Sequence, residues 1–185
     1  MKAPVSGKGN MAKETLPDPF VALAREAVEE YVRLARTASP AVPVPRELQS
    51  RSGAFICLKK HGRLRGCIGT IEAVQPNLAQ EIIENAVSAA VRDPRFDPVA
   101  EDELDDLEYA VDVMSTPEAI AGFAELDPKR YGVIVESGPK RGLLLPDLEG
   151  IDTVEEQVNI AMRKAGIFDG EPLTLYRFEV ERHDG

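Results

Sequence analysis

Two long segments of the chain carry apolar residues at the spacing of a helix that buries one side. Between residues 20 and 36, apolar side chains recur every three or four positions, with glutamate and arginine between them. Residues 76–91 show the same period, and Pro76 suits the first turn of a helix because that position needs no amide hydrogen. A third helix is expected from Thr153 to Lys164, where a capping box opens the segment and a glycine follows it.

Shorter apolar segments predict strands and two hairpins. Strands are expected at residues 54–60, 63–71, 109–114, 131–136, 142–145 and 173–181, and a short helix at 117–123. His61-Gly62 suits a two-residue turn between the first two strands, and residues 137–141 would join the fourth and fifth. Hairpins interspersed with helices, without regular strand–helix–strand alternation, predict an α+β fold with a largely antiparallel sheet and flanking helices.

Composition narrows the class of protein. The 185 residues fit one compact domain, which we place at residues 20–185 after a flexible tail at 1–19. A net charge of −10 argues against duplex DNA or an anionic membrane as partner, because both require basic surfaces. No apolar run is long enough to span a bilayer, and the tail lacks the apolar centre of a secretory signal. A cytoplasmic protein is therefore predicted.

The small number of cysteines and histidines limits the chemistry further. Two of each are too few for a disulfide framework, or for a four-ligand zinc site built from these residues alone. Reduced cysteines are the expectation. No metal site is predicted, although a site combining Cys67 with distant carboxylates stays open, and the cofactor is unknown.

The stretch Leu-Arg-Gly-Cys-Ile-Gly at residues 64–69 is the strongest candidate for a functional site. Arg65 lies two positions before Cys67, so on a strand both side chains share a face, and a cation there would favour the reactive thiolate. Gly66 and Gly69 leave the neighbouring amides open to a close ligand. The alternative interpretation is that Cys67 is a small buried hydrophobe and that the glycines mark a bulge or a tight packing contact.

The turn at His61-Gly62 fixes an expected register for the first hairpin. The expected pairs are Lys60 with Arg63, Leu58 with Arg65, and Ile56 with Cys67. In this register Cys57 and Cys67 lie on opposite faces of the sheet, so we expect no disulfide between them. A shift of one residue would change every one of these assignments.

Charged residues after the second helix form a second candidate group. Asp93 and Asp97 surround Arg95, as carboxylates around a guanidinium do in many catalytic or binding sites; alternatively, the group caps the helix and fixes the loop. His61 is expected in a solvated turn, which disfavours a Cys–His nucleophile pair, and His183 in the terminal tail is a poor ligand.

The order of motifs along the chain is more specific than any one of them. The series is Leu64-Arg65-Gly66-Cys67-Ile68-Gly69-Thr70, Ala89-Ala90 followed by Asp93-Pro94-Arg95-Phe96 and Pro98, Gly142-Leu143-Leu144-Leu145-Pro146, and Lys164-Ala165-Gly166. This series resembles the AMMECR domain family over about residues 20–180. Prokaryotic members of that family are commonly called protein A of the AmmeMemoRadiSam system, alongside a Memo-like protein and a radical SAM protein.

The resemblance carries expectations about fold and site. It implies an α+β fold of two unequal lobes, with an antiparallel sheet in the larger one. By matching motif positions, it implies a site at Arg65, Gly66, Cys67 and Gly69. Two further candidates, Asp93 and Arg95, come from the second motif block.

Two functional hypotheses follow, and a structural one stands beside them. In the first, the protein is an enzyme that uses Cys67 as a nucleophile or redox thiol, with Arg65 stabilising the thiolate or an anionic substrate. In the second, it is a non-enzymatic protein that docks with a Memo-like or a radical SAM protein through the hexapeptide face. In the third, the glycines and the thiol serve only to pack the hairpin.

Overall fold

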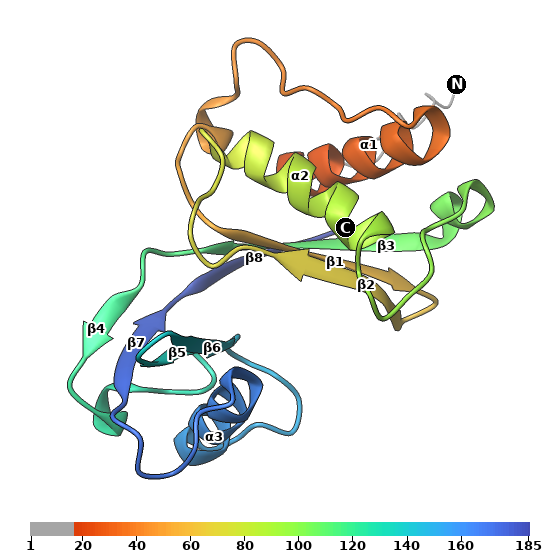
Figure 1. The fold of residues 1–185 in the computed structure, drawn as a ribbon. Helices are drawn as coiled ribbons and strands as arrows, with labels where there is room; N and C mark the ends of the chain where they lie inside the picture. Colours follow the sequence, from red (N-terminus) through yellow and green to blue (C-terminus); the bar gives the residue numbers. More distant parts are fainter. Residues whose placement is uncertain (1–16) are drawn as a thin grey trace, which may run out of the picture.

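A computed structural model describes residues 17–185, so the predicted tail lies almost entirely outside the described residues (Figure 1). In residues 17–185 the α-helices are α1 (Pro19–Leu34), α2 (Leu78–Val91) and α3 (Val154–Ala165), and short 3₁₀ helices lie at Arg46–Leu48, Glu101–Asp106 and Phe123–Glu125. The strands are β1 (Ala54–Lys60), β2 (Arg63–Gly69), β3 (Leu107–Met114), β4 (Glu118–Ile120), β5 (Gly132–Ser137), β6 (Lys140–Leu144), β7 (Thr174–Phe178) and β8 (Val180–Asp184). No helix in this part of the chain is both long and apolar enough to cross a membrane.

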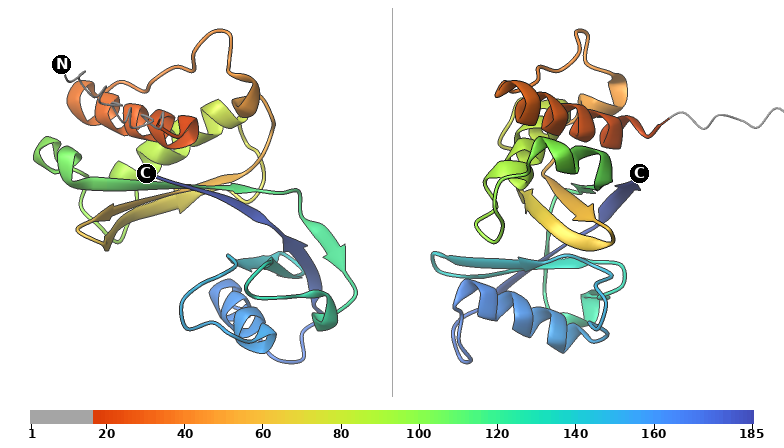
Figure 2. Two further views of the ribbon diagram at one scale, coloured as in Figure 1. Left: turned by 180° about the vertical axis from the view of Figure 1, so that it is seen from behind. Right: turned by 90° about the vertical axis from the view of Figure 1, so that its right-hand side faces the viewer.

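The strands of residues 17–185 form two antiparallel sheets in two unequal lobes. The larger lobe contains a sheet of order β2-β1-β3-β8, and the smaller lobe one of order β4-β7-β5-β6. Helices α1 and α2 cover one face of the larger sheet, and the other face is turned toward the smaller lobe (Figures 1 and 2). The smaller sheet in turn lies between α3 and the larger lobe (Figure 2). The predicted α+β fold is confirmed.

Three hydrophobic clusters hold these layers together in the described residues. One lies between the larger sheet and its two helices, and a second lies between α3 and the smaller sheet. The third joins the lobes: Met114, Ile134 and Phe178 are buried there, and Phe55 and Tyr176 pack against them from the facing sheets. The two lobes therefore share a small core of their own.

Two of the expected elements differ in the structure. The prediction of a short helix at residues 117–123 is wrong. The segment forms β4 instead, because β7, far along the chain, supplies its backbone partners. The strand expected at 173–181 is two strands that belong to different sheets. At the crossing point, Glu179 exchanges hydrogen bonds with Ser115, whose amide donates to the Glu179 carbonyl and whose hydroxyl accepts from the Glu179 amide.

A buried carboxylate fixes the loop that leaves the hexapeptide. Glu81 of α2 is buried and accepts hydrogen bonds from the hydroxyl of Thr70 at 2.6 Å and from the amides of Val74 at 2.8 Å and Gln75 at 2.7 Å. Asn85, one turn later, donates to the Ala54 carbonyl at 3.0 Å. The end of β2 is thus tied to α2 by side chains as well as by apolar packing.

We expect Glu81→Gln to lower the free energy of unfolding by about 2 to 4 kcal/mol, because an amide cannot accept all three hydrogen bonds and buried donors lose their partners. Urea unfolding followed by circular dichroism measures the change. Glu84→Gln on the same helix is the control, since Glu84 only accepts a hydrogen bond from Gln80, and its effect should stay within about 0.5 kcal/mol. Equal effects of the two substitutions would contradict this role of Glu81.

Candidate functional site

The hexapeptide lies on β2, which is an edge strand of the larger sheet and pairs with β1. The hairpin begins in the expected register, with Lys60 opposite Arg63. One residue is then inserted: Lys59 pairs with Leu64, the next pair is Leu58 with Gly66, and Arg65 is the unpaired residue of a β-bulge. The expected pairs Leu58–Arg65 and Ile56–Cys67 are therefore wrong.

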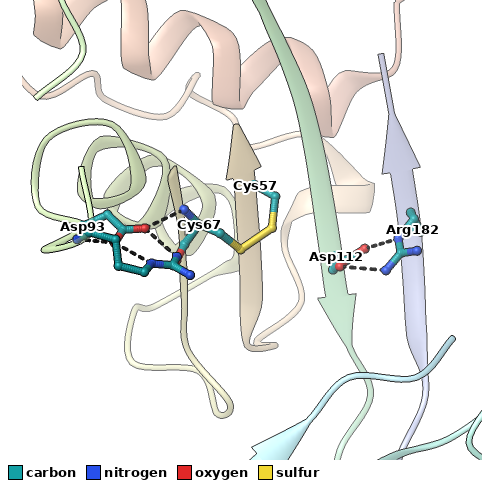
Figure 3. Close-up of a disulfide and its surroundings, with 6 residues drawn as sticks. Cys57, Cys67, Asp93, Asp112 and Arg182 are labelled. Carbon is teal, nitrogen blue, oxygen red and sulfur yellow. Dashed lines mark hydrogen bonds and ion pairs between the residues drawn. A yellow bond between two sulfur atoms is a disulfide. The ribbon is translucent and has the colours of Figure 1, made fainter. Parts of the chain in front are cut away.

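The bulge brings the two cysteines together. Cys57 lies directly opposite Cys67, and the two form a disulfide (Figure 3). Their Cα atoms are 4.1 Å apart, the short spacing of a non-hydrogen-bonded pair in an antiparallel sheet, in which side chains lie closest. The expectation that a disulfide would not form is wrong, because the inserted residue moves Cys67 to the face that carries Cys57.

Close packing against α2 directly follows the bulge. Gly66 is buried, and a Cβ atom at this position would overlap the carbonyl oxygen of Ala89 in α2. At Gly69 a Cβ would overlap the ring of Phe55 and the carbonyl oxygen of Ala54. The nearest neighbours of both glycines are thus parts of the chain itself. Both glycines are closely packed, Gly66 against α2 and Gly69 against β1. Their role as binding positions stays a prediction.

A buried carboxylate and an exposed guanidinium hold the backbone of Cys67 (Figure 3). The amide of Cys67 donates to Oδ2 of Asp93 at 2.9 Å, and Nη2 of Arg95 donates to the Cys67 carbonyl at 3.1 Å. Arg95 also binds both carboxylate oxygens of Asp93, from Nε at 2.9 Å and from Nη2 at 2.6 Å. These bonds satisfy the outward-facing backbone groups of an edge strand.

The charges in this arrangement are strongly coupled. The Asp93 side chain is 2% exposed and that of Arg95 is 54% exposed. The hydrogen bonds from Arg95 hold the pKa of the Asp93 carboxyl well below its usual range, against the opposing effect of burial, and the amide of Cys67 adds to the lowering. Asp93 is therefore a fixed anion at neutral pH, and Arg95 its fixed counter-ion.

Arg65 does not lie beside the sulfur of Cys67. Its guanidinium binds Glu103 at 2.7 Å and donates to the carbonyls of Asp97 at 2.9 Å and Pro98 at 3.3 Å. Glu103 also accepts from Lys60, a residue on the helix-covered face of the hairpin. The prediction that Arg65 and Cys67 share a face is wrong, because the bulge separates them.

A second Asp–Arg pair lies on the disulfide-bearing face, on the other side of the cysteines (Figure 3). Asp112 of β3 accepts from Nε of Arg182 at 2.8 Å and from Nη2 at 3.1 Å. Neither residue was among the candidates predicted from the sequence. The alternation of apolar and polar residues along β3 could have pointed to Asp112 on the face away from the helices. No local pattern places Arg182, 70 residues away, opposite Asp112.

Histidines contribute little to this site. His61 is exposed in the hairpin turn, as predicted. His183 is not in a terminal tail: it lies in β8, its Nδ1 is 2.8 Å from Asp18, and its ring stacks on Phe20. Across residues 17–185, no group of three or more His, Cys, Asp or Glu side chains is arranged to hold a metal ion.

Comparison with known proteins gives consistent matches. A family model described as AMMECR1 matches residues 21–183. A protein of Thermotoga maritima is 54% identical over 168 residues, which cover 89% of this chain and 97% of that protein. A protein of Clostridium acetobutylicum is 50% identical over 175 residues, or 93% of this chain and 37% of its own length. The crystal structure of an uncharacterised protein of Pyrococcus horikoshii, PH0010, is similar with a TM-score of 0.80 and 35% identity, covering 88% of each chain.

The packing at Gly66 leads to a first test of the site. We expect Gly66→Ala to lower the free energy of unfolding by about 1 to 3 kcal/mol, because α2 and β2 must separate to admit a methyl group. Chemical denaturation measures the loss. Gly122→Ala is the control, since its backbone is extended and no other atom lies within 4 Å of the added Cβ. If the two variants unfold alike, Gly66 does not set the contact between α2 and β2.

The Arg65–Glu103 pair leads to a prediction about pH. Hydrogen bonds from Arg65 lower the pKa of Glu103 from 4.5 to about 2. The pKa of Glu103 is depressed in the folded state. The stability that its pair with Arg65 contributes is therefore fully present above the pKa of the unfolded state, and it is lost as pH falls through about 2. We expect Glu103→Gln to lose about 3 kcal/mol of stability near neutral pH and to unfold with a flatter acid profile than the parent protein.

Urea unfolding between about pH 6 and pH 2 measures both effects. Asp105→Asn, an exposed residue of the same turn, is the control and should keep the acid profile of the parent protein. An unchanged profile in Glu103→Gln would show that the Arg65 pair does not stabilise the folded state.

Proposed function

The chain belongs to the AMMECR1 family, and we propose that it acts as a thiol–disulfide redox protein through Cys57 and Cys67. One observation carries this proposal. The disulfide joins two neighbouring strands on the sheet face opposite the helices, and both cysteines are partly exposed and lie outside the three hydrophobic clusters. A redox couple needs sulfur atoms that a thiolate can reach.

The position of the disulfide argues against a purely structural role, because the bridge adds little stability there. The strands that it joins are already held by a backbone ladder from Phe55–Gly69 to Lys60–Arg63. The bridge spans a sequence separation of only 10 residues, so the loop entropy that it removes from the unfolded chain is small, on the order of 2 to 3 kcal/mol. In the reducing cytoplasm, the location predicted from the sequence, disulfides are mostly transient and catalytic or redox-sensing.

The backbone clamp on Cys67 supports reversible chemistry. Asp93 and Arg95 hold the amide and the carbonyl of Cys67, and the ladder holds Cys57. Neither set of bonds involves a sulfur atom, so we expect the two thiols to stay opposite each other after reduction. Two thiols kept in contact reoxidise as an intramolecular pair, which favours rapid cycling.

The reaction balances with an external dithiol as reductant. A thiolate of the dithiol attacks one sulfur, the Cys57–Cys67 bond breaks, and the released cysteine takes up a proton. The second thiolate of the dithiol then attacks the dithiol sulfur of the mixed disulfide, so that the dithiol closes to its own disulfide and the other cysteine is released and protonated. Two electrons and two protons pass to the protein, and the dithiol becomes a disulfide. In the reverse direction the protein oxidises a dithiol.

Docking with a Memo-like or a radical SAM protein stays the alternative function. It is a prediction from the family resemblance, and no contact among residues 17–185 favours it over the redox site. The nucleophile hypothesis for Cys67 requires the reduced form, so it depends on the same redox step. In either case the cation beside Cys67 is Arg95, through the Cys67 backbone, and Arg65 has a separate role.

A redox titration tests the proposal. We expect the folded protein to pass reversibly between disulfide and dithiol in buffers of reduced and oxidised dithiothreitol, following the relation for a two-electron couple. Quenching with N-ethylmaleimide and intact-mass measurement gives the fraction of doubly alkylated chain. Far-ultraviolet circular dichroism of the reduced form should match that of the oxidised form.

The two single variants Cys57→Ser and Cys67→Ser are the controls, since each retains one thiol and should show no couple. The proposal is wrong if the bond is reduced only after denaturant is added, or if the reduced chain unfolds. Either result would assign the disulfide a structural role.

A further inference from the structure

We propose that the redox couple acts on small thiols or disulfides that carry carboxylate groups, and that Arg95 and Arg182 bind these groups on either side of Cys57–Cys67. This inference rests on the redox function proposed above and gives it a substrate class. It starts from the order of side chains across the face of the larger sheet that lies opposite the helices (Figure 3).

The rows of this face follow from the strand register. Cys67 lies opposite Cys57, and Cys57 lies opposite Ala110 on β3. In the next row, Asp112 lies opposite Arg182 of β8. Arg95 lies beyond the free edge of β2, bound to the Cys67 carbonyl. The disulfide therefore lies between two guanidinium groups, and only the small side chain of Ala110 separates Cys57 from β8 in its own row.

The two Asp–Arg pairs are built alike, with a buried anion and an exposed cation. Asp93 is 2% exposed and Arg95 54%, and Asp112 is 5% exposed and Arg182 41%. A molecule that approaches the disulfide therefore meets the guanidinium groups, while the carboxylates that neutralise them lie underneath. The buried carboxylates also fix the orientation of each guanidinium, which reduces the entropy lost when a ligand binds.

Each guanidinium has donors left for a ligand. Arg95 uses Nε and Nη2 for Asp93 and the Cys67 carbonyl, and Arg182 uses Nε and Nη2 for Asp112. The Nη1 group of each arginine lies outside these bonds. A carboxylate can accept from such a group in a charge-assisted hydrogen bond, the stronger class of hydrogen bond at a partly exposed site.

The other charged groups near this face have opposite effects on the binding of an anion. Asp184 lies opposite Ala110 and disfavours an anion, as does Asp147, which acts on Arg182. Lys164 of α3 favours an anion near Arg95. Desolvation lowers the pKa of Lys164 most, and the nearby positive charge of Arg95 lowers it further. Lys59 lies opposite Glu108 in the row nearer the turn, so their charges offset each other. The fixed guanidinium groups are thus the features that distinguish this face in a chain of net charge −10.

The step with a monothiol balances as follows. One substrate thiolate attacks a sulfur of the Cys57–Cys67 bond, forming a mixed disulfide and releasing the other cysteine. A second substrate thiolate attacks the mixed disulfide and releases the first cysteine. Both cysteines are protonated, and two substrate thiols leave as one disulfide. The role of Arg95 and Arg182 is to raise the local concentration of the anionic thiol and to orient its sulfur.

Rates of reduction by small thiols of different charge test the inference. The probes are mercaptosuccinate with two carboxylates, 2-mercaptoethanol with none, and cysteamine with an ammonium group. Each rate constant is expressed per thiolate and divided by the rate of the same thiol with 2-hydroxyethyl disulfide, which removes intrinsic reactivity. We expect the corrected rate of mercaptosuccinate to exceed that of cysteamine by roughly tenfold, and the ratio to fall as salt is added.

Variants locate the effect. Arg182→Gln should lower the ratio of the mercaptosuccinate rate to the cysteamine rate severalfold. Arg182→Lys, which keeps the charge, should lower it less. Arg95→Gln should act in the same direction. Arg63→Gln is the control, because Arg63 is an exposed arginine at the hairpin turn that makes neither Asp–Arg pair. Circular dichroism and the melting temperature identify any variant that does not fold.

The outcomes separate the two proposals. If no thiol reduces the disulfide in the folded protein, the redox function itself is wrong. If thiols reduce it but cysteamine is as fast as or faster than mercaptosuccinate, the net negative charge of the chain governs the encounter and the substrate class is wrong. If mercaptosuccinate is preferred but Arg182→Gln and Arg95→Gln match Arg63→Gln, the two arginines are not the binding groups.

Discussion

The contact between α2 and β2 at Gly66 is the constraint on which the site depends. The absence of a side chain at Gly66 lets the carbonyl of Ala89 approach the strand, and the bulge at Arg65 lies directly before this point. After the bulge, every residue of β2 faces the opposite way from the simple hairpin register, so Cys67 meets Cys57. The same helix leads into Asp93, which fixes the Cys67 backbone. The helix that packs on Gly66, next to the bulge, therefore also leads into the residue that holds the Cys67 backbone.

Buried carboxylates recur around this site, each with its own set of donors. Glu81 holds the loop after β2 through backbone amides and a hydroxyl, and Asp93 and Asp112 hold Arg95 and Arg182. An ionised carboxylate is costly to bury unless its oxygens are hydrogen-bonded, and all three meet this condition. A consequence for the surface is that cations are displayed where the anions are hidden. An acidic protein can in this way display individual guanidinium groups on its surface.

The arrangement of the two lobes leaves the disulfide outside their shared core. Two crossings of the chain, after β3 and after β7, join the lobes, and Ser115 and Glu179 hydrogen-bond to each other where these crossings meet. Phe55, on the face of the larger sheet opposite the helices, packs against the shared hydrophobic cluster. Cys57, on the same face of β1, lies outside that cluster and is partly exposed. The smaller lobe thus packs on one row of this face, and the cysteine row lies outside the shared cluster.

The sequence by itself determined the helices, most of the strands and the α+β class, because these follow from local periodicity and from capping and turn residues. It also singled out residues 64–69 and the Asp93–Arg95 segment, and the structure brings the two together at Cys67. The tertiary structure decided what the pattern could not: the bulge at Arg65, the Cys57–Cys67 pair, and the Asp112–Arg182 pair beside it. The physical reason is that a strand has a side-chain period of two, so one inserted residue reverses its faces. The insertion lies next to the contact of Gly66 with the backbone of Ala89, more than 20 positions away in the chain, and no local pattern records that contact.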